Sequence, residues 1–339
     1  MIYIVLFFLA VSLLLYVLLA GADFGAGIIE LFSSKENQAI TKNTVYRVMG
    51  PVWEANHIWI IIMIVILWVA FPKYYYIIVT ALHIPLTLVL LGITLRGVAF
   101  VFRHYDAYKD KSQILYDWMF KISSLVTPIF LGMTFGAMIS GEIIVTENLG
   151  DYSFKELYIA SWFNGFSILI GFFFAALCAF LSSVLLIGEA ELEAKKVYIK
   201  KATYATVAVV LIGFITIAYG YYKEIPFVNN FLSNTYAIPT IVLSGVLLFP
   251  LWKSVRGGRR ILSRTYAGLQ MLLILLAALF PQYPNLLFTT NISISIMDNV
   301  APDSVITVLG ITLLIGGFVI LPGLFHLLKS FKMIKILEK

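Results

Sequence analysis

Cysteine is almost absent from this chain. Cys178 is the one cysteine among 339 residues, so no disulfide can form within the chain and no cluster of cysteines can hold a metal ion. Cys178 also lies inside a long apolar stretch and is uninformative about the redox compartment. Disulfide-stapled scaffolds are thereby excluded as a class.

Charge is scarce as well. Charged residues make up 12% of the chain and hydrophobic residues 61%, with a mean hydropathy of +0.95, whereas an ordinary soluble domain has about 25% charged and about 45–50% apolar residues. A globule of this length cannot hide so much apolar surface, so lipid must cover part of it. The composition predicts an all-α integral membrane protein, with residues 1–339 forming a single polytopic membrane domain.

The apolar residues recur in nine stretches, most of them near the ~20 residues that cross a bilayer. The predicted spans are residues 2–22, 52–71, 74–101, 117–139, 160–187, 202–221, 236–252, 265–280 and 303–328. The first has no Lys or Arg before its apolar core, so we expect a retained helix rather than a signal peptide, with an interfacial continuation to about Phe32. The seventh and eighth are short. Pro85, Pro128 and Pro322 are expected to kink their helices.

Lysine and arginine are distributed unevenly between the two sides of this topology. The segments after the odd-numbered spans carry nineteen of the 24 Lys and Arg residues, and the opposite segments carry only Lys73, Lys155 and Lys223. Cytoplasmic loops are the ones enriched in these residues. We therefore expect the N-terminus outside and the C-terminus in the cytoplasm. The net charge of +6 reflects topology, and nucleic acid is not an expected partner.

The first motif ends the first span, where residues 21–27 read G-A-D-F-G-A-G. Glycines four apart allow another helix to approach closely. Asp23 should point into the bundle, because a carboxylate facing lipid costs a few kcal/mol. The alternative is that Asp23 lies at the interface and only caps or anchors the helix end.

The second motif opens the second span, where residues 50–59 read G-P-V-W-E-A-N-H-I-W. Glu54 and His57 are three residues apart and would share a helix face. A carboxylate beside an imidazole near a water-accessible end is a plausible proton relay, and Trp53 is suited to an interfacial anchor. The alternative is a polar cluster that ties helices together without proton traffic.

The third motif closes the third span, where residues 95–104 read L-R-G-V-A-F-V-F-R-H. Arg96 is expected within the inner third of the membrane and needs either a snorkelling route or a counter-charge, for which Asp23 and Glu54 are at matching depth. Arg103 reads as a positive-inside anchor. On the fourth span, Gly132 and Gly136 form a GxxxG pattern that carries little weight alone.

Signals for a bound cofactor are missing. A haem held by two histidines needs a pair at one depth, and of His57, His83, His104 and His326 only His83 is expected deep in the membrane. We find no HExxH, no dense carboxylate set and no glycine-rich phosphate loop. The expectation is that this chain has no catalytic, metal or cofactor-binding residues of its own.

Taken together, the three motifs resemble subunit II of cytochrome bd-type quinol oxidases. They appear as G-x-D-F-G-x-G, P-x-W-E-x-N-x-x-W and R-G-V-A-F-x-F-R. Further similar residues surround the fourth span: Asp117, Trp118, Pro128, Gly132 and Gly136. The specific motifs lie within residues 21–136, whereas the length and the nine spans agree over the whole chain.

The resemblance implies a respiratory complex in a bacterial or archaeal cell membrane. A homologous subunit I would bind the b-type and d-type haems and oxidise quinol, and a small single-helix accessory subunit often accompanies the pair. The complex would reduce dioxygen to water with protons taken from the cytoplasm.

The resemblance also implies roles for single residues. The acid matching Glu54 is implicated in a proton path from the cytoplasm, and the one matching Asp23 lies close to it, so Glu54, Asp23 and His57 are proton-pathway candidates and Arg96 an ion-pair candidate. Many members have an acid where this chain has Val101. Proton transfer here would then use another group, water or a path in subunit I.

Two other classes were weighed against an oxidase subunit. A proton-coupled secondary transporter would show inverted repeats and ionisable residues near the midplane, but no repeat is visible and the ionisable residues gather in the inner third. A passive scaffold would use the same polar groups only to hold helices together. Glu54→Gln and Asp23→Asn distinguish the scaffold from proton conduction, because unchanged oxidase turnover and haem content would exclude a proton role.

Overall fold

The computed structural model describes residues 1–49, 53–105, 111–146, 148–188, 192–290 and 293–330. The long helices are α1 (Ile2–Leu31), α6 (His83–Tyr105), α7 (Ser112–Ser140), α8 (Gly165–Ile187), α9 (Leu192–Tyr222), α13 (Arg260–Leu279) and α14 (Asp303–Ser330). The shorter helices are α2 (Lys35–Met49), α3 (Trp53–Asn56), α4 (Ile58–Ala70), α5 (Pro72–Ala81), α10 (Pro226–Ser233), α11 (Ala237–Val246) and α12 (Leu248–Arg256). Single turns η1 (Leu149–Asp151) and η2 (Glu156–Ala160) and the antiparallel strands β1 (Leu287–Phe288) and β2 (Ser293–Ile294) complete the described elements.

The predicted all-α membrane architecture is confirmed. Within the described residues, eight helices are long and apolar enough to cross a membrane, and the bent pair α4–α5 brings the number to nine. The seventh and eighth spans are not short, because each runs on into basic residues and reaches 20 residues, at Ala237–Arg256 and Arg260–Leu279.

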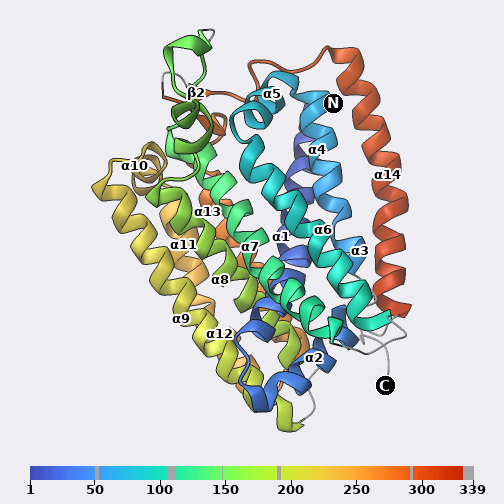
Figure 1. Ribbon diagram of the computed structural model, residues 1–339. Coiled ribbons are helices and arrows are strands. Elements are labelled where there is room, and N and C mark those ends of the chain that lie inside the picture. The colour runs from blue at the N-terminus through green and yellow to red at the C-terminus, as the bar shows by residue number, and fades with distance from the viewer. Residues whose placement is uncertain (50–52, 106–110, 147, 189–191, 291–292, 331–339) are drawn as a thin grey trace.

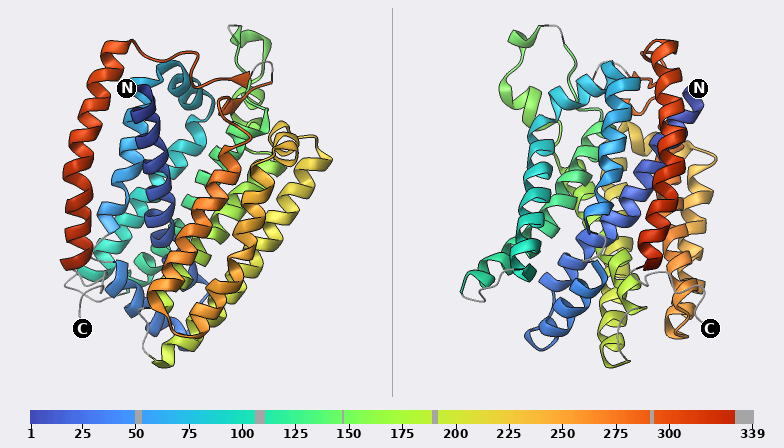
Figure 2. Two further views of the ribbon diagram at one scale, coloured as in Figure 1. Left: turned by 180° about the vertical axis from the view of Figure 1, so that it is seen from behind. Right: turned by 90° about the vertical axis from the view of Figure 1, so that its right-hand side faces the viewer.

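The helices run between two ends of an elongated bundle (Figures 1 and 2). The N-terminus, α5, α10 and the β1–β2 hairpin lie at one end, and α2 and the α12–α13 connection lie at the other. The second end carries the basic segments, so it is the cytoplasmic end by the distribution of Lys and Arg. The two ends are called outer and inner below.

Helix α1 lies in the interior of the inner half of the bundle. It packs against α8, α7, α4 and α14, and all eleven residues from Ala20 to Glu30 are buried. The predicted continuation of this helix to about Phe32 is confirmed, since α1 ends at Leu31, but its residues are buried in the bundle rather than interfacial. The helix continues without a break to Leu31, because glycines at 21, 25 and 27 let neighbouring helices close around it.

The second and third predicted spans have different boundaries from those in the structure. α4 ends at Phe71, where the backbone leaves helical geometry, and Pro72 starts α5 at an angle of 118°. Proline lacks the N–H that would continue the α4 hydrogen bonds. The third span is thus α6, from His83 onward, rather than residues 74–101.

His83 is consequently not deep in the membrane. It begins α6 at the outer end, is exposed, and has Nδ1 2.9 Å from the carbonyl oxygen of Thr80, with its ring edge-on to Tyr158. Pro85 lies in the first turn of α6 rather than in its interior, so it cannot act as the predicted kink. Pro128 and Pro322 do lie inside helices α7 and α14.

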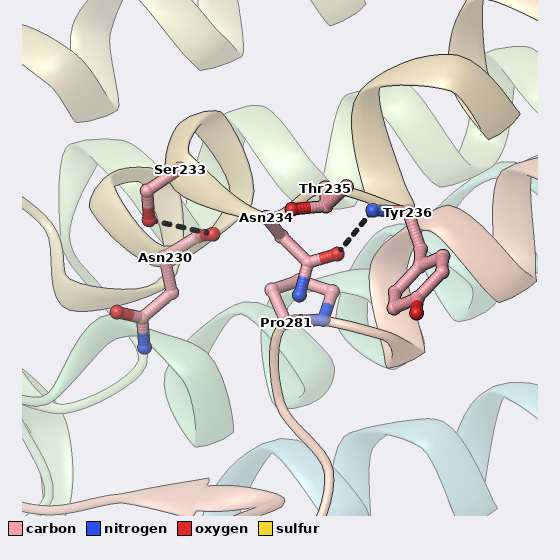
Figure 3. A pocket seen from close by; sticks show the side chains of 6 residues that line it. All are labelled: Asn230, Ser233, Asn234, Thr235, Tyr236 and Pro281. Atoms are coloured by element: carbon pink, nitrogen blue, oxygen red, sulfur yellow. Dashed lines mark hydrogen bonds between the residues drawn. The ribbon is translucent and has the colours of Figure 1, made fainter.

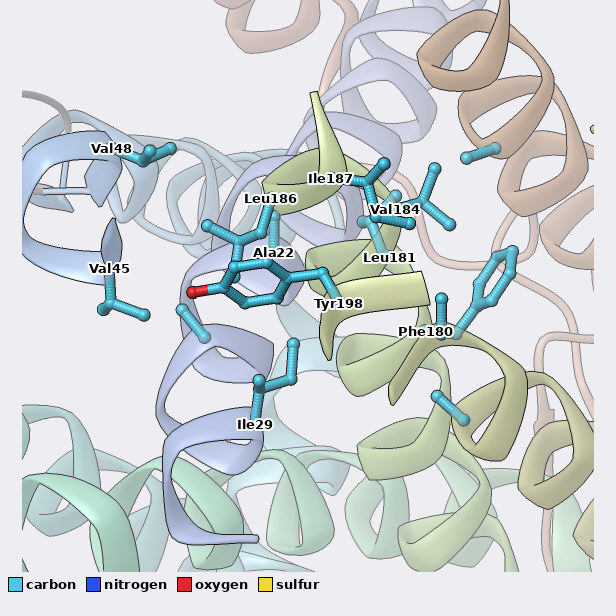
Figure 4. Packing of buried hydrophobic residues seen from close by; sticks show 14 of the residues in the cluster. Ala22, Ile29, Val45, Val48, Phe180, Leu181, Val184, Leu186, Ile187 and Tyr198 are labelled. Atoms are coloured by element: carbon cyan, nitrogen blue, oxygen red, sulfur yellow. The ribbon is translucent and has the colours of Figure 1, made fainter. Parts of the chain in front are cut away.

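Helix α2 was not expected from the sequence and covers the inner end of α1. Its Val45 and Val48 belong to a buried cluster with Ala22 and Ile29 of α1, and Tyr198 of α9 lies among them (Figure 4). Beside this cluster the Lys201 amine donates hydrogen bonds to the Ser33 hydroxyl at 2.5 Å, the Thr41 hydroxyl at 3.1 Å and the Ile29 carbonyl at 3.3 Å. The Lys201 cation thus adds a hydrogen bond to one carbonyl in the last turn of α1, where positive charge is favourable.

Helices α7 and α8 approach closely along small residues. A Cβ added to Gly132 would lie 2.7 Å from the Cα of Gly171, and one added to Gly136 would lie 2.7 Å from the Cα of Ser167. The GxxxG pattern is therefore a packing surface. α8 starts beside it with Asn164, whose side chain caps the helix by accepting from the Ser167 N–H at 2.8 Å.

Candidate functional site: a buried ion-pair ladder

Asp23 and Arg96 form a fully buried ion pair between α1 and α6. The guanidinium donates to both carboxylate oxygens, at 2.5 and 2.8 Å, and to the Asp23 carbonyl oxygen at 2.9 Å, and its Nε donates to the Ser124 hydroxyl at 3.0 Å. Both side chains are 1% exposed. This two-pronged geometry is the strong form of a charge-assisted hydrogen bond. Asp23 is therefore not an interfacial cap, and of the two partners expected for Arg96, Asp23 and Glu54, the structure pairs it with Asp23.

Two glycines place Asp23 at this depth. A Cβ on Gly25 would lie 1.9 Å from the Cys178 carbonyl oxygen of α8, and one on Gly27 would lie 2.1 Å from the Ser124 hydroxyl of α7. No side chain fits at either position, so the α1 backbone contacts the α8 backbone at Gly25 and the Ser124 side chain of α7 at Gly27. With α7 and α8 packed this closely against α1, the Asp23 side chain points towards α6, where it meets Arg96.

A second rung lies two helical turns further towards the inner end. Arg103 donates to Glu30 at 2.5 Å, and both side chains are at most 1% exposed. The Arg103 Nε lies 2.7 Å from Asp117 of α7, which also accepts from Lys42 of α2 at 2.7 Å. Arg103 is thus a buried partner, and its interpretation as a simple positive-inside anchor is wrong.

Lys121 completes the charged cluster from α7. It is 4% exposed, and its amine lies 3.8 Å from Glu30. We call the seven residues the ion-pair ladder: Asp23, Glu30, Lys42, Arg96, Arg103, Asp117 and Lys121. The ladder joins α1, α2, α6 and α7 at the inner end, and three of these helices, α1, α6 and α7, carry residues of the sequence motifs.

The Phe120 ring separates the two guanidinium groups. Its centroid lies 4.8 Å from the Arg96 carbon Cζ and 4.9 Å from that of Arg103. Each contact is a cation–π interaction, which strengthens when water is excluded. Phe120 is fully buried, so the ring occupies the space between two like charges that would otherwise be filled by solvent.

The sequence missed Glu30 although a signal was present. Asp23 and Glu30 are seven residues apart, and so are Arg96 and Arg103, with a constant offset of 73 between partners. Equal two-turn spacing on two helices predicts two matching pairs. Glu30 was missed because it lies eight residues beyond the predicted end of the first span at residue 22, whereas Asp23 lies only one residue beyond it.

His57 occupies a break between α3 and α4, so the continuous span expected over residues 52–71 is interrupted there. The residue is half-buried, and its ring lies 5.7 Å from the Phe24 ring and 6.2 Å from the Tyr16 ring. Trp53 packs on Phe100 of α6 at 5.3 Å, so it is not simply an interfacial anchor. Glu54 falls within α3, but its side chain lies outside the described part of the structure.

A shallow polar pocket of about 430 Å³ lies at the outer end, on α10, α11 and the end of α13 (Figure 3). Its polar atoms already serve the local fold. The Asn234 side-chain oxygen accepts from the N–H groups of Tyr236 and Ala237, both at 2.9 Å, and thereby caps α11. The Ser233 hydroxyl donates to the Asn229 carbonyl. This pocket contributes nothing to the ladder.

Over the described residues, no three His, Cys, Asp or Glu side chains converge in a metal-binding arrangement.

The fold and the ladder define a multi-pass helical membrane protein whose inner end is fixed by buried ion pairs. A family model described as "Cytochrome bd terminal oxidase subunit II" matches residues 1–331. The chain belongs to this family, as its sequence motifs predicted.

Individual relatives agree with this assignment. The chain is 29% identical over 176 residues to "Cytochrome bd ubiquinol oxidase subunit 2" of Bacillus subtilis (strain 168), an alignment that spans 51% of this chain and about half (49%) of that relative. It is 24% identical over 328 residues to "Putative cytochrome bd menaquinol oxidase subunit II" of the same strain, spanning 94% of this chain and 91% of the relative.

A solved structure has the same fold. A chain in "The structure of bd oxidase from Geobacillus thermodenitrificans" superposes with a TM-score of 0.77 at 17% identity, covering 98% of this chain and 100% of that one. At this identity the match establishes the shared architecture.

Proposed function

We propose that this chain is the haem-free subunit II of a quinol:oxygen oxidoreductase in a respiratory chain. It would assemble with a haem-bearing subunit I that carries b-type and d-type haems and oxidises quinol, together with a small single-helix accessory subunit. The observation that carries this proposal is the family match over residues 1–331, supported by the names of the two Bacillus relatives.

The ladder supports a role in holding the complex together. Burying ionised groups costs several kcal/mol per ion unless each is paired with good geometry. The pairs therefore fix α1, α6 and α7 in one register and leave little freedom at the inner end. A rigid inner end is what a partner subunit needs to dock against.

The finer part of the proposal is that protons pass through this subunit from the cytoplasm. Glu54 and His57 are the carriers in this proposal, because they lie three residues apart in the second motif and the half-buried His57 ring packs 5.7 Å from the Phe24 ring of α1. Asp23 has both carboxylate oxygens engaged by Arg96, so its role is to supply fixed charge. Phe24 links His57 to that pair, since the Arg96 carbon Cζ lies 5.4 Å from the centroid of the same ring.

The test of assembly is purification through a tag on this chain in mild detergent, followed by a reduced-minus-oxidised spectrum. Co-elution of a larger partner with b-type and d-type haem bands, lost when the partner is deleted, is the expected result. A stable haem-free protein without a partner would overturn the oxidase proposal and favour a transport assay in proteoliposomes.

The test of proton conduction is Glu54→Gln and His57→Gln in the assembled complex. We expect haem content to be kept while quinol-driven oxygen consumption and proton uptake fall together. Glu142→Gln is the matched control, since Glu142 is an exposed acid beyond the outer end of α7. If neither Glu54→Gln nor His57→Gln changes turnover, proton conduction is wrong and only a scaffold role remains for these residues.

A further inference from the structure

Four side chains near the ladder each have a buried polar atom without a hydrogen-bond partner among the described residues. They are the hydroxyls of Ser12 and Tyr16, the indole N–H of Trp59 and Nδ1 of His57. Ser12, Tyr16 and Trp59 are 0%, 3% and 4% exposed. Most buried polar atoms in folded proteins are paired, so four such atoms in one region require an explanation.

The four side chains line one internal region between α1 and α4, which we call the Tyr16 seam. The Tyr16 and His57 rings lie 6.2 Å apart, and Tyr16 and Trp59 belong to the same buried cluster as Phe24 and Cys178. Ser12 lies one helical turn beyond Tyr16 on the same face of α1. The seam begins beside the ladder, because the Phe24 ring lies 5.7 Å from the His57 ring and its centroid lies 5.4 Å from the Arg96 carbon Cζ.

The chemistry of these groups matches water. A buried polar atom left unpaired costs about 1–3 kcal/mol, and a buried water typically makes about three hydrogen bonds to such atoms. Trp59 can only donate, Tyr16 and Ser12 can donate and accept, and Nδ1 of His57 can accept in one tautomer. One water molecule could therefore accept from an indole or phenol and donate to the imidazole.

We propose that the Tyr16 seam is an internal site for ordered water, which extends the proton route of the proposed function from His57 along α1. Ser12 and Asp23 are eleven residues apart, so the site carries the route about 16 Å beyond the Asp23–Arg96 pair. A proton would enter a water at His57 while another leaves at the Ser12 end, with no net change in any side chain. This extension depends on the proposed function, but the water site itself does not.

Water in the seam can be detected by radiolytic hydroxyl-radical footprinting of the intact complex, since radicals formed from a bound water oxidise the side chains beside it. Trp162 is the matched control. It is 7% exposed, and its indole N–H donates to the Tyr158 carbonyl oxygen at 2.7 Å. Exposure alone predicts faster oxidation of Trp162. We expect the reverse, with Trp59 oxidised severalfold faster, and equal or slower oxidation of Trp59 would overturn the water site.

The extension is tested by Tyr16→Phe and Ser12→Ala, which remove one hydroxyl each and keep the fold. We expect unchanged haem content, severalfold lower turnover and a larger solvent isotope effect. If Glu54→Gln slows the oxidase and neither hydroxyl variant does, the extension is wrong and the proposed function stands. If none of the three variants changes turnover, proton conduction through this subunit is wrong as well.

Discussion

The ion-pair ladder and the Tyr16 seam share helix α1 and treat buried polarity differently. In the ladder every charged side chain has an opposite charge within 4 Å, even where single atoms lack a hydrogen bond. In the seam the groups are neutral or titratable, and four of their atoms have no partner among the described residues. The difference follows from cost, since an unpaired buried charge is far more expensive than an unpaired hydroxyl. Protein atoms must neutralise the first, whereas water suffices for the second.

Arg96→Met would produce the largest loss, because it leaves Asp23 buried without a counter-charge. Removing one partner of a buried pair costs about 3–5 kcal/mol. The expected readout is a markedly lower thermal midpoint of the purified complex and reduced abundance in membranes. Asp23→Leu combined with Arg96→Met should recover much of the loss, and a double variant as unstable as the single one would contradict the charge argument.

Gly25→Ala tests the packing that aims Asp23 at α6. Its added methyl group would meet the Cys178 carbonyl oxygen, and overpacking of this kind costs about 1–3 kcal/mol. Gly21→Ala is the matched control on the same helix, because its Cβ would lie 3.6 Å from the Cys178 sulfur, an ordinary contact. Thermal midpoints of the two variants should differ clearly. Equal midpoints would show that α1 and α8 can separate without harm.

Lys42→Met removes the most exposed member of the ladder. Lys42 and Asp117 have side chains that are 32% and 25% exposed, and pairs open to solvent are worth up to about 1 kcal/mol. Asp117 also retains Arg103. We expect a small decrease in the thermal midpoint that disappears at high salt. A decrease as large as that of Arg96→Met would mean that the contribution of a ladder residue to stability does not depend on its burial.

Tyr16→Phe should have the smallest effect on stability. If water satisfies the hydroxyl, its removal deletes a net contribution of about 1 kcal/mol or less. Differential scanning of the purified complex should place this variant within a degree or two of the parent. A large decrease in the thermal midpoint would indicate that the Tyr16 hydroxyl has a direct protein partner. Tyr16 would then resemble the ladder residues rather than the other seam residues.

Sequence reasoning recovered the helices and one rung of the ladder for physical reasons. Apolar length depends on local composition, so the spans could be predicted. Asp23 was one of two expected partners of Arg96, because opposite charges at one depth in the membrane require each other.

The misses have equally specific causes. Hydropathy does not report direction, so the bend at Pro72 and the outer position of His83 were invisible. Arg103 and Glu30 lie where charges are normally solvated, and only the packing of α2 and α7 over them makes that place interior. The Tyr16 seam involves side chains that are common in membrane helices, and only three-dimensional contacts reveal that they meet.

The constant offset of 73 residues between the ladder partners has a consequence for biosynthesis. Chains are made at about 5–20 residues per second, so on the order of ten seconds separate the synthesis of α1 from that of its partners in α6. During that interval the nascent α1 carries two acidic side chains without their guanidinium groups. The newly made helix therefore cannot settle at its final depth alone, and it must wait near the cytoplasmic surface, or beside another protein, until α6 enters the bilayer.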